Sequence, residues 1–320
     1  ADAGDSLSRS AQAHLYDRLD WYRDLERHSG LGAPIVVKAQ AGTASAWLFL
    51  RRDGRTLHSY ANYYTLEFRP FTNKDALLSV ISQLVSTLRS ITNWDRLILS
   101  PIPDEDGTAG ALHAAMPGSH LSQAATNWFA HTADTDAYWA ARPSRLRNTI
   151  RRRRASTQLD ISIFNVFEDI PFTDYESIYR RSWKPAEGSE AFVRALAKRE
   201  GAAGTLRLGI ARLAGEAIAA QLWLVENGRA TIHKLAHDEA HKALSPGTLL
   251  TAAMFDHVLT ADRPAEIDYG LGNEAYKADW MDAQRPRFRI DWFNPWTSRG
   301  RALHLAWRLR QRLAGLRTPD

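Results

Sequence analysis

Cysteine is absent from the 320 residues of this sequence. Its absence excludes a disulfide framework, a zinc site built on thiolates, an iron–sulfur cluster and a thiol nucleophile, and it fits a reducing compartment. No stretch approaches the ~18 consecutive apolar residues that a membrane-spanning helix needs. Residues 1–10 lack the basic start and the apolar segment of a signal peptide. We therefore expect a cytoplasmic protein.

The usual catalytic motifs are missing as well. The sequence has no P-loop, no G-x-S-x-G elbow, no H-E-x-x-H motif and no G-x-G-x-x-G after an expected strand. Its histidines and carboxylates show no metal-ligand spacing, so we expect no metal cofactor. With 44% hydrophobic and 24% charged residues, the composition excludes wholesale disorder. The net charge of +5 indicates an anionic partner, such as nucleotide phosphates, a membrane surface or nucleic acid.

One order of elements occurs twice along the chain, and the turns Asp53-Gly54 and Asn227-Gly228 lie at matching points, 174 residues apart. We therefore expect two copies of one mixed α/β fold, with a first half at 1–141, a second at 142–300 and a C-terminal helix at 301–320. The first half is expected to hold helices at 14–27, 75–91 and 109–115 and strands at 34–39, 46–50, 56–71, 96–99 and 127–131. The second half is expected to hold helices at 175–183, 190–199, 246–260 and 273–280 and strands at 206–213, 217–225, 230–237, 266–269 and 288–293.

Seven arginines lie within residues 142–154, at the junction of the two halves. One interpretation is a nucleic-acid or phosphate site. The other is a solvated helix that joins two domains, with Leu146 and Ile150 packed one turn apart. No aromatic residue interleaves with the arginines, so we favour the helix and do not expect nucleic acid as a partner.

The segment 230–260 is the first candidate for chemistry. In a regularly alternating strand, His233 and His237 lie on one face and Lys234 on the other. After this strand, Ser245 is placed to cap a helix whose first residue is a proline, and the glycine that follows leaves the first-turn N–H groups accessible. Such a helix start is an anion site that suits a pyrophosphate, whereas the alternative is simply a well-capped helix.

The segment 268–280 is the second candidate, because it places Asp, Glu, Tyr and Lys at the end of a short buried strand, where open α/β sheets bind ligands. The alternative is a turn followed by Tyr276 and Trp280 packing one turn apart on a helix.

Together, these segments resemble a known family. The arginine-rich helix, the run Ser245-Pro246-Gly247-Thr248-Leu249-Leu250 and the motif Asp268-Tyr269-Gly270-x-Gly272-x-x-x-Tyr276-Lys277-x-x-Trp280 are similar to the acetyltransferase family named after the cellulose-associated CelD proteins. That family belongs to the GNAT superfamily and is related to the Fem-type transferases, which contain two GNAT-like halves. The resemblance covers residues 144–295 and implies a tandem GNAT-like fold with a degenerate N-terminal half. The usual Q/R-x-x-G-x-G/A loop is replaced by the shorter segment 244–250.

The resemblance also implies an acyl-CoA co-substrate whose pyrophosphate meets the amides near Gly247 and Thr248. The other cofactor contacts expected are Ser245, Leu249 and Lys277.

N-acylation needs a base and an acid, and the candidate catalytic residues are His233, His237, Asp268 and Tyr276. The histidines have a reference pKa suited to a base at neutral pH, although packed histidines are the alternative. Asp268 or Glu274 is expected to orient the acceptor ammonium or to act through water, and Tyr276 to protonate the leaving thiolate.

Two apolar features concern the acceptor. Residues 301–317 predict an amphipathic helix with a leucine stripe and a basic remainder, suited to an anionic membrane surface or to packing against the domain. Tyr63 and Tyr64, together with Tyr60, Phe68 and Phe71, form an aromatic-rich segment expected to line an apolar substrate channel.

We therefore predict an acyl-CoA-dependent N-acyltransferase acting on a lipidic, sphingoid-base-type amine, as in bacterial ceramide synthesis, in the cytoplasm and peripherally at the inner membrane. The alternatives are a Fem-like aminoacyl or acetyl transferase for a cell-envelope or sugar amine, and a non-catalytic module that binds RNA or a protein partner.

Overall fold

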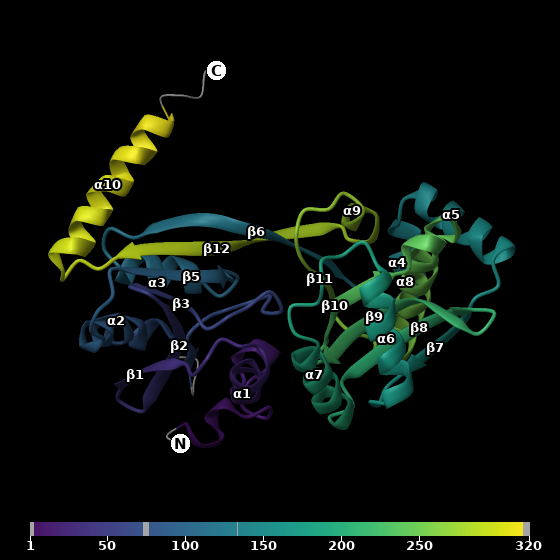
Figure 1. The fold of residues 1–320 in the computed structure, drawn as a ribbon, viewed down its shortest axis with the longest axis horizontal. Coiled ribbons are helices and arrows are strands. Elements are labelled where there is room, and N and C mark those ends of the chain that lie inside the picture. The colour runs from purple at the N-terminus through teal and green to yellow at the C-terminus, as the bar shows by residue number, and fades with distance from the viewer. Residues whose placement is uncertain (1–2, 73–76, 133, 316–320) are drawn as a thin grey trace. The chain divides into compact units, whose positions relative to one another are not determined.

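The computed structural model describes residues 3–72, 77–132 and 134–315. The chain divides into two compact units (Figure 1). Unit 1 comprises Ala1–Ala125 and Pro286–Asp320, and unit 2 comprises Thr126–Arg285. Strands β6 (His120–His131) and β12 (Ala283–Phe293) each contribute residues to both units. For that reason the chain passes from one unit to the other at residues 125/126 and 285/286.

Unit 1 is a sheet with helices. Its strands follow the order β1-β2-β3-β5-β12, in which β3 and β5 are parallel and the other neighbours are antiparallel, and β4 pairs with β2. Its strands are β1 (Ile35–Ala41), β2 (Ala44–Asp53), β3 (Thr56–Ser59), β4 (Phe71–Thr72) and β5 (Arg96–Ile102). Its helices are η1 (Gly4–Leu7), η2 (Leu15–Asp17), α1 (Leu19–His28), α2 (Leu77–Thr87), η3 (Leu88–Ser90), α3 (Thr108–Ala115) and α10 (Ser298–Gly315).

Unit 2 repeats this plan. Its strands follow the order β6-β11-β10-β9-β8-β7, in which β10 and β11 are parallel. Its further strands are β7 (Asp160–Phe164), β8 (Leu206–Leu213), β9 (Glu216–Glu226), β10 (Arg229–His237) and β11 (Glu266–Leu271). Its helices are α4 (Thr135–Ala141), α5 (Ser144–Ser156), α6 (Asp169–Arg181), α7 (Glu190–Ala202), η4 (Glu239–Leu244), α8 (Pro246–His257), the π-helical turn η5 (Val258–Asp262) and α9 (Lys277–Trp280).

The two units show the repeat that the sequence predicts. In unit 1, the antiparallel strands β1, β2 and β3 are followed by helix α2 and by β5, which is parallel to β3. In unit 2, the antiparallel strands β8, β9 and β10 are followed by helix α8 and by β11, which is parallel to β10. Gly54 and Gly228 occupy the hairpin turns at positive φ, which glycine adopts without strain. The last strand of each half completes the other unit: residues 127–131 of β6 pair with β11, and residues 288–293 of β12 pair with β5. The predicted mixed α/β fold is confirmed, and the strand exchange is new.

Several predicted elements of unit 1 were wrong in extent. The expected strand 56–71 ends at Ser59, and the chain then runs irregularly to β4. Most of the aromatic residues in this segment are buried, and the Phe71 ring lies 5.0 Å from that of Tyr22. The buried ones, Tyr60, Tyr64, Phe68 and Phe71, therefore form part of the core of unit 1. The helix expected at 14–27 begins at Leu19, after the short turn η2. Residues 75, 76, 316 and 317 of the expected helices lie outside the described residues.

The core of unit 2 lies between the sheet and helix α8. The ring of Phe255, on α8, stacks on Tyr138 at 4.8 Å and on Trp280 at 5.2 Å, and it meets the edge of Trp223 at 5.1 Å. This aromatic packing holds α8 and α9 against the strands. Within the described part of the chain, no helix has both the length and the apolar character to cross a membrane.

Candidate active site

A cavity of about 300 Å³ opens in unit 2 where β10 and β11 part. The two strands are paired at 229–231 and 266–268, and the cavity is lined by residues further along them, at 235–237 and at Tyr269. Ligands bind beyond the carboxyl ends of parallel strands, in largely apolar cavities with a few polar groups. The other lining residues are Leu146, Trp183, Gln221, Lys242, Ser245, Pro246, Gly247, Thr248, Thr251, Tyr276, Asp279 and Trp280.

The first turn of α8 forms one wall of the cavity. Ser245 has a φ of 57°, in the left-handed region, and not the extended backbone of a serine whose side chain caps a helix. The helix begins at Pro246, and its first backbone bond runs from the N–H of Leu249 to the carbonyl of Ser245 at 3.1 Å. The N–H groups of Gly247 and Thr248 therefore precede the regular ladder and are oriented to bind an anion.

Gly247 brings the start of α8 close to His237 of β10. A Cβ atom at this position would lie 3.1 Å from Nδ1 of His237. Only glycine therefore lets the helix start pack against the histidine without moving it. The predicted cofactor segment is thus in contact with one predicted catalytic residue.

A buried hydrogen-bond chain fixes this turn of α8, and sequence analysis missed it. Trp223 donates from Nε1 to the amide oxygen of Gln221 at 2.8 Å, and the amide nitrogen of Gln221 donates to the Thr251 hydroxyl at 2.6 Å. That hydroxyl donates to the carbonyl of Gly247 at 2.7 Å. The signal in the sequence was a glutamine in the middle of an otherwise apolar strand, because a buried amide needs partners.

The two predicted histidines do not share a strand face, so that prediction was wrong. The pairing of β10 with β9 shifts by one residue at His233, since Ile232 and Lys234 face consecutive residues of β9. Such a bulge reverses the alternation of side chains after it. His237 consequently lies on the α8 side, in the cavity, whereas His233 is half-buried, with both ring nitrogens shielded from solvent, in the field of Glu200 on α7.

Electrostatics separate the two histidines further. Burial, assisted by the charge of Lys234, lowers the pKa of His233 from 6.5 to about 3. The pKa of His237 is also lowered by burial, and Glu239, whose carboxylate lies 3.6 Å from Nε2 of His237, opposes part of that shift. Both rings are therefore neutral at neutral pH, but only His237 faces the cavity, where a neutral imidazole can accept a proton.

Lys184 is a charged residue near the cavity that sequence analysis did not identify. Burial lowers its pKa from 10.5 to about 8, and the neighbouring ammonium of Lys234 adds to the effect. Its Nζ lies 5.6 Å from the ring of Trp183, which in turn packs 4.4 Å from the ring of His237. Lys234 itself is buried and paired with Glu187 at 2.8 Å.

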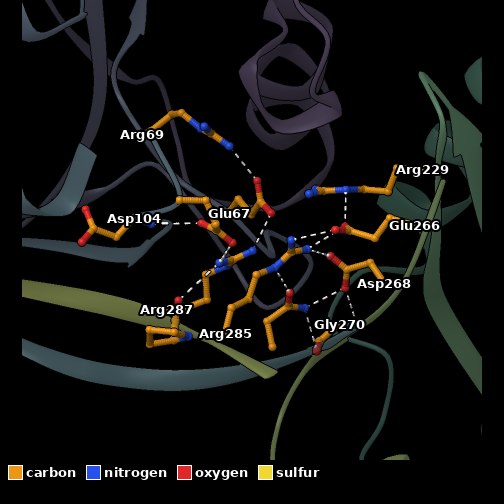
Figure 2. Close-up of polar contacts among 12 residues, drawn as sticks. Glu67, Arg69, Asp104, Arg229, Glu266, Asp268, Gly270, Arg285 and Arg287 are labelled. Carbon is orange, nitrogen blue, oxygen red and sulfur yellow. Dashed lines mark hydrogen bonds and ion pairs between the residues drawn. The ribbon is translucent and has the colours of Figure 1, made fainter. Parts of the chain in front are cut away.

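Asp268 does not line the cavity and is fully engaged in a buried network (Figure 2). Its carboxylate accepts hydrogen bonds from Asn127 and from the N–H of Gly270, both at 2.7 Å, and from Arg285 at 3.0 Å. Arg285 also forms a bidentate pair with Glu266. This network positions the strand end and holds Gly270 at a φ of 72°.

Figure 2 also shows a second buried network, which belongs to unit 1. Arg287 pairs with Glu67 at 2.7 Å and with Glu105 at 2.6 Å, and Glu67 accepts a further bond from Arg69 at 2.7 Å. These charges are compensated in pairs, as buried charges must be.

The loop before α9 places three predicted residues differently. Tyr276 is partly exposed and lines the cavity, edge-on to Tyr269 at 5.8 Å. Lys277 is buried, donates to the carbonyl of Leu271 at 2.5 Å and pairs with Glu274 at 3.0 Å. Burial opposes ionisation of Glu274, but hydrogen bonds from the backbone and from Lys277 outweigh it and lower the pKa of Glu274. Lys277 and Glu274 thus hold the loop that presents Tyr276.

The remaining predicted residues lie elsewhere. The side chain of Leu249 is buried in α8. Tyr63 and Tyr64 belong to unit 1, where Tyr63 is 72% exposed and Tyr64 is buried beside it. The cavity therefore brings together His237, Ser245, Gly247, Thr248 and Tyr276 of the predicted set.

Three solved structures share this fold over nearly all of the chain. L-PGS from Bacillus licheniformis is 14% identical with a TM-score of 0.60, covering 94% of this chain and 98% of that one. FemX is 8% identical with a TM-score of 0.61, covering 90% and 97%. A tandem GNAT protein from the clavulanic acid biosynthesis pathway is 13% identical with a TM-score of 0.51, covering 91% and 93%. The tandem GNAT-like fold is thereby confirmed.

Sequence comparison assigns the second half of the chain more specifically. No curated protein sequence matches the chain at a significant level. Residues 141–278, however, match the model of the acetyltransferase (GNAT) domain. This segment holds α5, the strands β7 to β11 and α8, which include the walls of the cavity. Residues 141–278 therefore form a GNAT-type acyltransferase domain.

Proposed function

We propose that the protein transfers an acyl group from an acyl-CoA thioester to a primary amine in the cavity of unit 2. One observation carries this proposal: within a GNAT-type domain, the first-turn amides of α8, the neutral imidazole of His237 and the hydroxyl-bearing Tyr276 line the same cavity. These groups are an anion site, a base and an acid, which together are what N-acylation requires.

The donor is held by the start of α8. CoA carries a pyrophosphate, and the N–H groups of Gly247 and Thr248 supply hydrogen bonds and the positive end of the helix dipole to it. The Gln221–Thr251 hydrogen bond at 2.6 Å keeps this turn fixed before the donor arrives. Because the first turn of α8 is already ordered, donor binding costs little conformational entropy there.

The chemical step follows from the positions of His237 and Tyr276. The amine nitrogen attacks the thioester carbonyl, a C–N bond forms, and the amine proton passes to His237. The tetrahedral intermediate collapses, the C–S bond breaks, and the thiolate takes a proton from Tyr276. The products are an amide and CoA thiol. Burial is the main cause that lowers the pKa of His237, and the positive charge of Lys184 beside the cavity adds to it, so the ring stays in its basic form.

We propose a lipidic, long-chain amino alcohol of the sphingoid-base type as the acceptor. The support is the apolar part of the cavity wall, where Leu146, Leu235 and Trp280 surround the polar groups. Such a wall gives favourable burial to the apolar chain next to the amine.

CoA thiol release tests this reaction. Purified protein is incubated with acyl-CoAs from acetyl to long-chain, with and without a sphinganine-type base in mixed micelles, and the product is identified by mass spectrometry. We expect acceptor-dependent release, an amide product and a long-chain preference. H237Q is expected to lower turnover at least a hundredfold, whereas H241Q, the same exchange in a histidine that does not line the cavity, is expected to retain it. Absence of release with every acyl-CoA would refute the donor.

A second candidate is aminoacyl transfer from tRNA, favoured by a different cavity of about 380 Å³ in unit 2. It is lined by Arg147, Arg151 and Arg154 of α5 and by Trp139, which are cations and an aromatic ring that suit a phosphate backbone and a base. Asp256 lines it as well and pairs with Arg154 at 2.8 Å, which leaves Arg147 and Arg151 as the cations for the phosphates. The fold shared with L-PGS and FemX supports this candidate. Transfer of a labelled amino acid from aminoacyl-tRNA to an amine or lipid, lost in the R147Q/R151Q variant while CoA release stays absent, would select it. Binding of RNA without any transfer would select the non-catalytic alternative.

A further inference from the structure

Helix α10 presents an apolar stripe to solvent. Leu305, Leu309 and Leu313 are spaced four residues apart, which places them on one face. Their exposed fractions are 62%, 51% and 60%. Three leucines aligned and exposed on one helix face are unusual on the surface of a soluble protein and mark an interaction site.

The opposite face of α10 is the one that packs on unit 1. His304 stacks on Phe293 with ring centres 5.5 Å apart, and Trp307 stacks on His120 at 3.7 Å. In Figure 1, the second half of α10 extends beyond the strands of unit 1. The leucine stripe is therefore not needed to attach the helix, and a rotation that buries it would break the His304 and Trp307 contacts.

Arginines border the leucine stripe on both sides. On a helical projection, Arg301 and Arg308 fall on one flank, and Arg310 falls on the other. The sequence of residues 298–315 contains neither Asp nor Glu. The outward face of α10 is thus apolar along its middle and positively charged along its edges, the pattern of helices that lie in a membrane interface.

A cavity of about 410 Å³ in unit 1 adjoins this helix. Four arginines line it, namely Arg55, Arg96, Arg299 and Arg310, against one carboxylate, that of Asp95. Asp95 pairs with Arg55 at 2.6 Å and with Arg299 at 2.9 Å, and Arg96 pairs with Asp291, which lies outside the lining. The charge that remains is positive, and Phe293, Leu303 and Trp307 supply an apolar wall beside it.

We infer that α10 and the arginine cavity together bind the surface of an anionic phospholipid bilayer. Leu305, Leu309 and Leu313 enter the interface, the flanking arginines attract the anionic surface, and the cavity receives the phosphate of one lipid. A second copy of the chain fits less well, because two such faces bring arginines against arginines. Nucleic acid would use the arginines but would leave the leucines exposed.

Vesicle co-sedimentation of the full chain tests this inference, without acyl donor or amine acceptor, so its result is independent of the proposed reaction. We expect binding to vesicles of phosphatidylcholine with phosphatidylglycerol, weak binding to phosphatidylcholine alone, and a decrease as salt rises. Leu305→Ser with Leu309→Ser, and separately Arg308→Gln with Arg310→Gln, should each lower the partition coefficient at least tenfold. The control is Arg27→Gln with Arg152→Gln, which removes equal charge from exposed positions on α1 and α5.

Because the sequence has no cysteine, a single introduced cysteine can be labelled at a chosen position, and the label reports whether that position enters the bilayer. Leu309→Cys carrying an environment-sensitive fluorophore should shift to the blue with anionic vesicles, and Arg27→Cys should not. Equal loss of binding in the charge control would overturn the inference, since net charge alone would then explain binding. So would α10-dependent dimers without vesicle binding, or an unchanged spectrum at position 309.

Discussion

His233 allows a quantitative test of the charge distribution around β10. Burial among neighbours that include Lys234 lowers its pKa from 6.5 to about 3, and both ring nitrogens are shielded from solvent. The unfolded chain exposes the imidazole and restores its ordinary pKa. Between these two values the unfolded state binds a proton that the native state does not bind. Stability must therefore fall as the pH drops from about 6.5 towards 3.

The size of the effect follows from the two pKa values of His233. At pH 7.5 the ring is neutral in both states and contributes no pH dependence. At pH 4.5, about two pH units below the pKa of the exposed ring, proton binding favours the unfolded state by about 3 kcal/mol. Below pH 3 the difference levels off at about 5 kcal/mol, because the native ring then becomes protonated as well.

The measurement is urea unfolding of the wild type and of His233→Gln at pH 7.5 and at pH 4.5. Other groups titrate in the same range, so the informative quantity is how much less the variant loses than the wild type does. We expect the wild type to lose about 2–3 kcal/mol more than the variant. His241→Gln, the same exchange in a half-exposed ring, should behave like the wild type. Equal losses in the wild type and in His233→Gln would refute the buried, neutral assignment of His233 and reopen its candidacy as a base.

Three further predictions concern the cavity and its surroundings. His237→Gln should lower kcat/KM at least a hundredfold, and the wild-type pH profile should show an acidic limb below pH 6.5. Because the carboxylate of Glu239 raises the pKa of His237, Glu239→Gln should move this limb to still lower pH. An unchanged pH profile in Glu239→Gln would contradict this. Gly247→Val should raise the KM for the donor and lower kcat about tenfold or more, because its Cβ meets His237 at 3.1 Å; unchanged steady-state kinetics would contradict it. Glu187→Gln should destabilise the protein by about 3 kcal/mol in urea unfolding, since it leaves the buried ammonium of Lys234 without its carboxylate, and an unchanged midpoint would exclude that pair as a structural one.

The sequence was informative where structure is local. The hairpin turns at Gly54 and Gly228, and the helix start at Pro246, depend on a few adjacent residues, so their positions could be read directly. The cavity segment 245–248 was found for the same reason. The irregular run from Ser59 to β4 was read as a strand because its aromatic residues favour strands, whereas tertiary burial in the core of unit 1 decided the outcome.

Features that depend on which strands pair, such as the bulge at His233 and the exchange of β6 and β12, could not be predicted from the sequence. The bulge at His233 depends on the register between β10 and β9, and the residue type at position 233 does not predict it. The exchange of β6 and β12 between the units is likewise decided by strand pairing. Each of these strands would show the same alternation of side chains whichever sheet it joined. The borders of the compact units follow from that pairing and not from any change in composition near residues 125 or 285.

The strand exchange also explains the role of the polar motif at the end of β11. In the sequence this motif resembles a catalytic site, whereas in the structure most of its polar residues hold a loop in place. In unit 2, Asp268 needs partners for a buried carboxylate, and Asn127 of β6 and Arg285 of β12 supply them. The same aspartate accepts from the N–H of Gly270, so the two exchanged strands fix the turn that begins the loop. Lys277 then ties that loop back to the carbonyl of Leu271, and Tyr276 is presented to the cavity next to it. The charged cluster at this strand end therefore positions the loop, while Tyr276, the loop residue that lines the cavity, is the one left exposed.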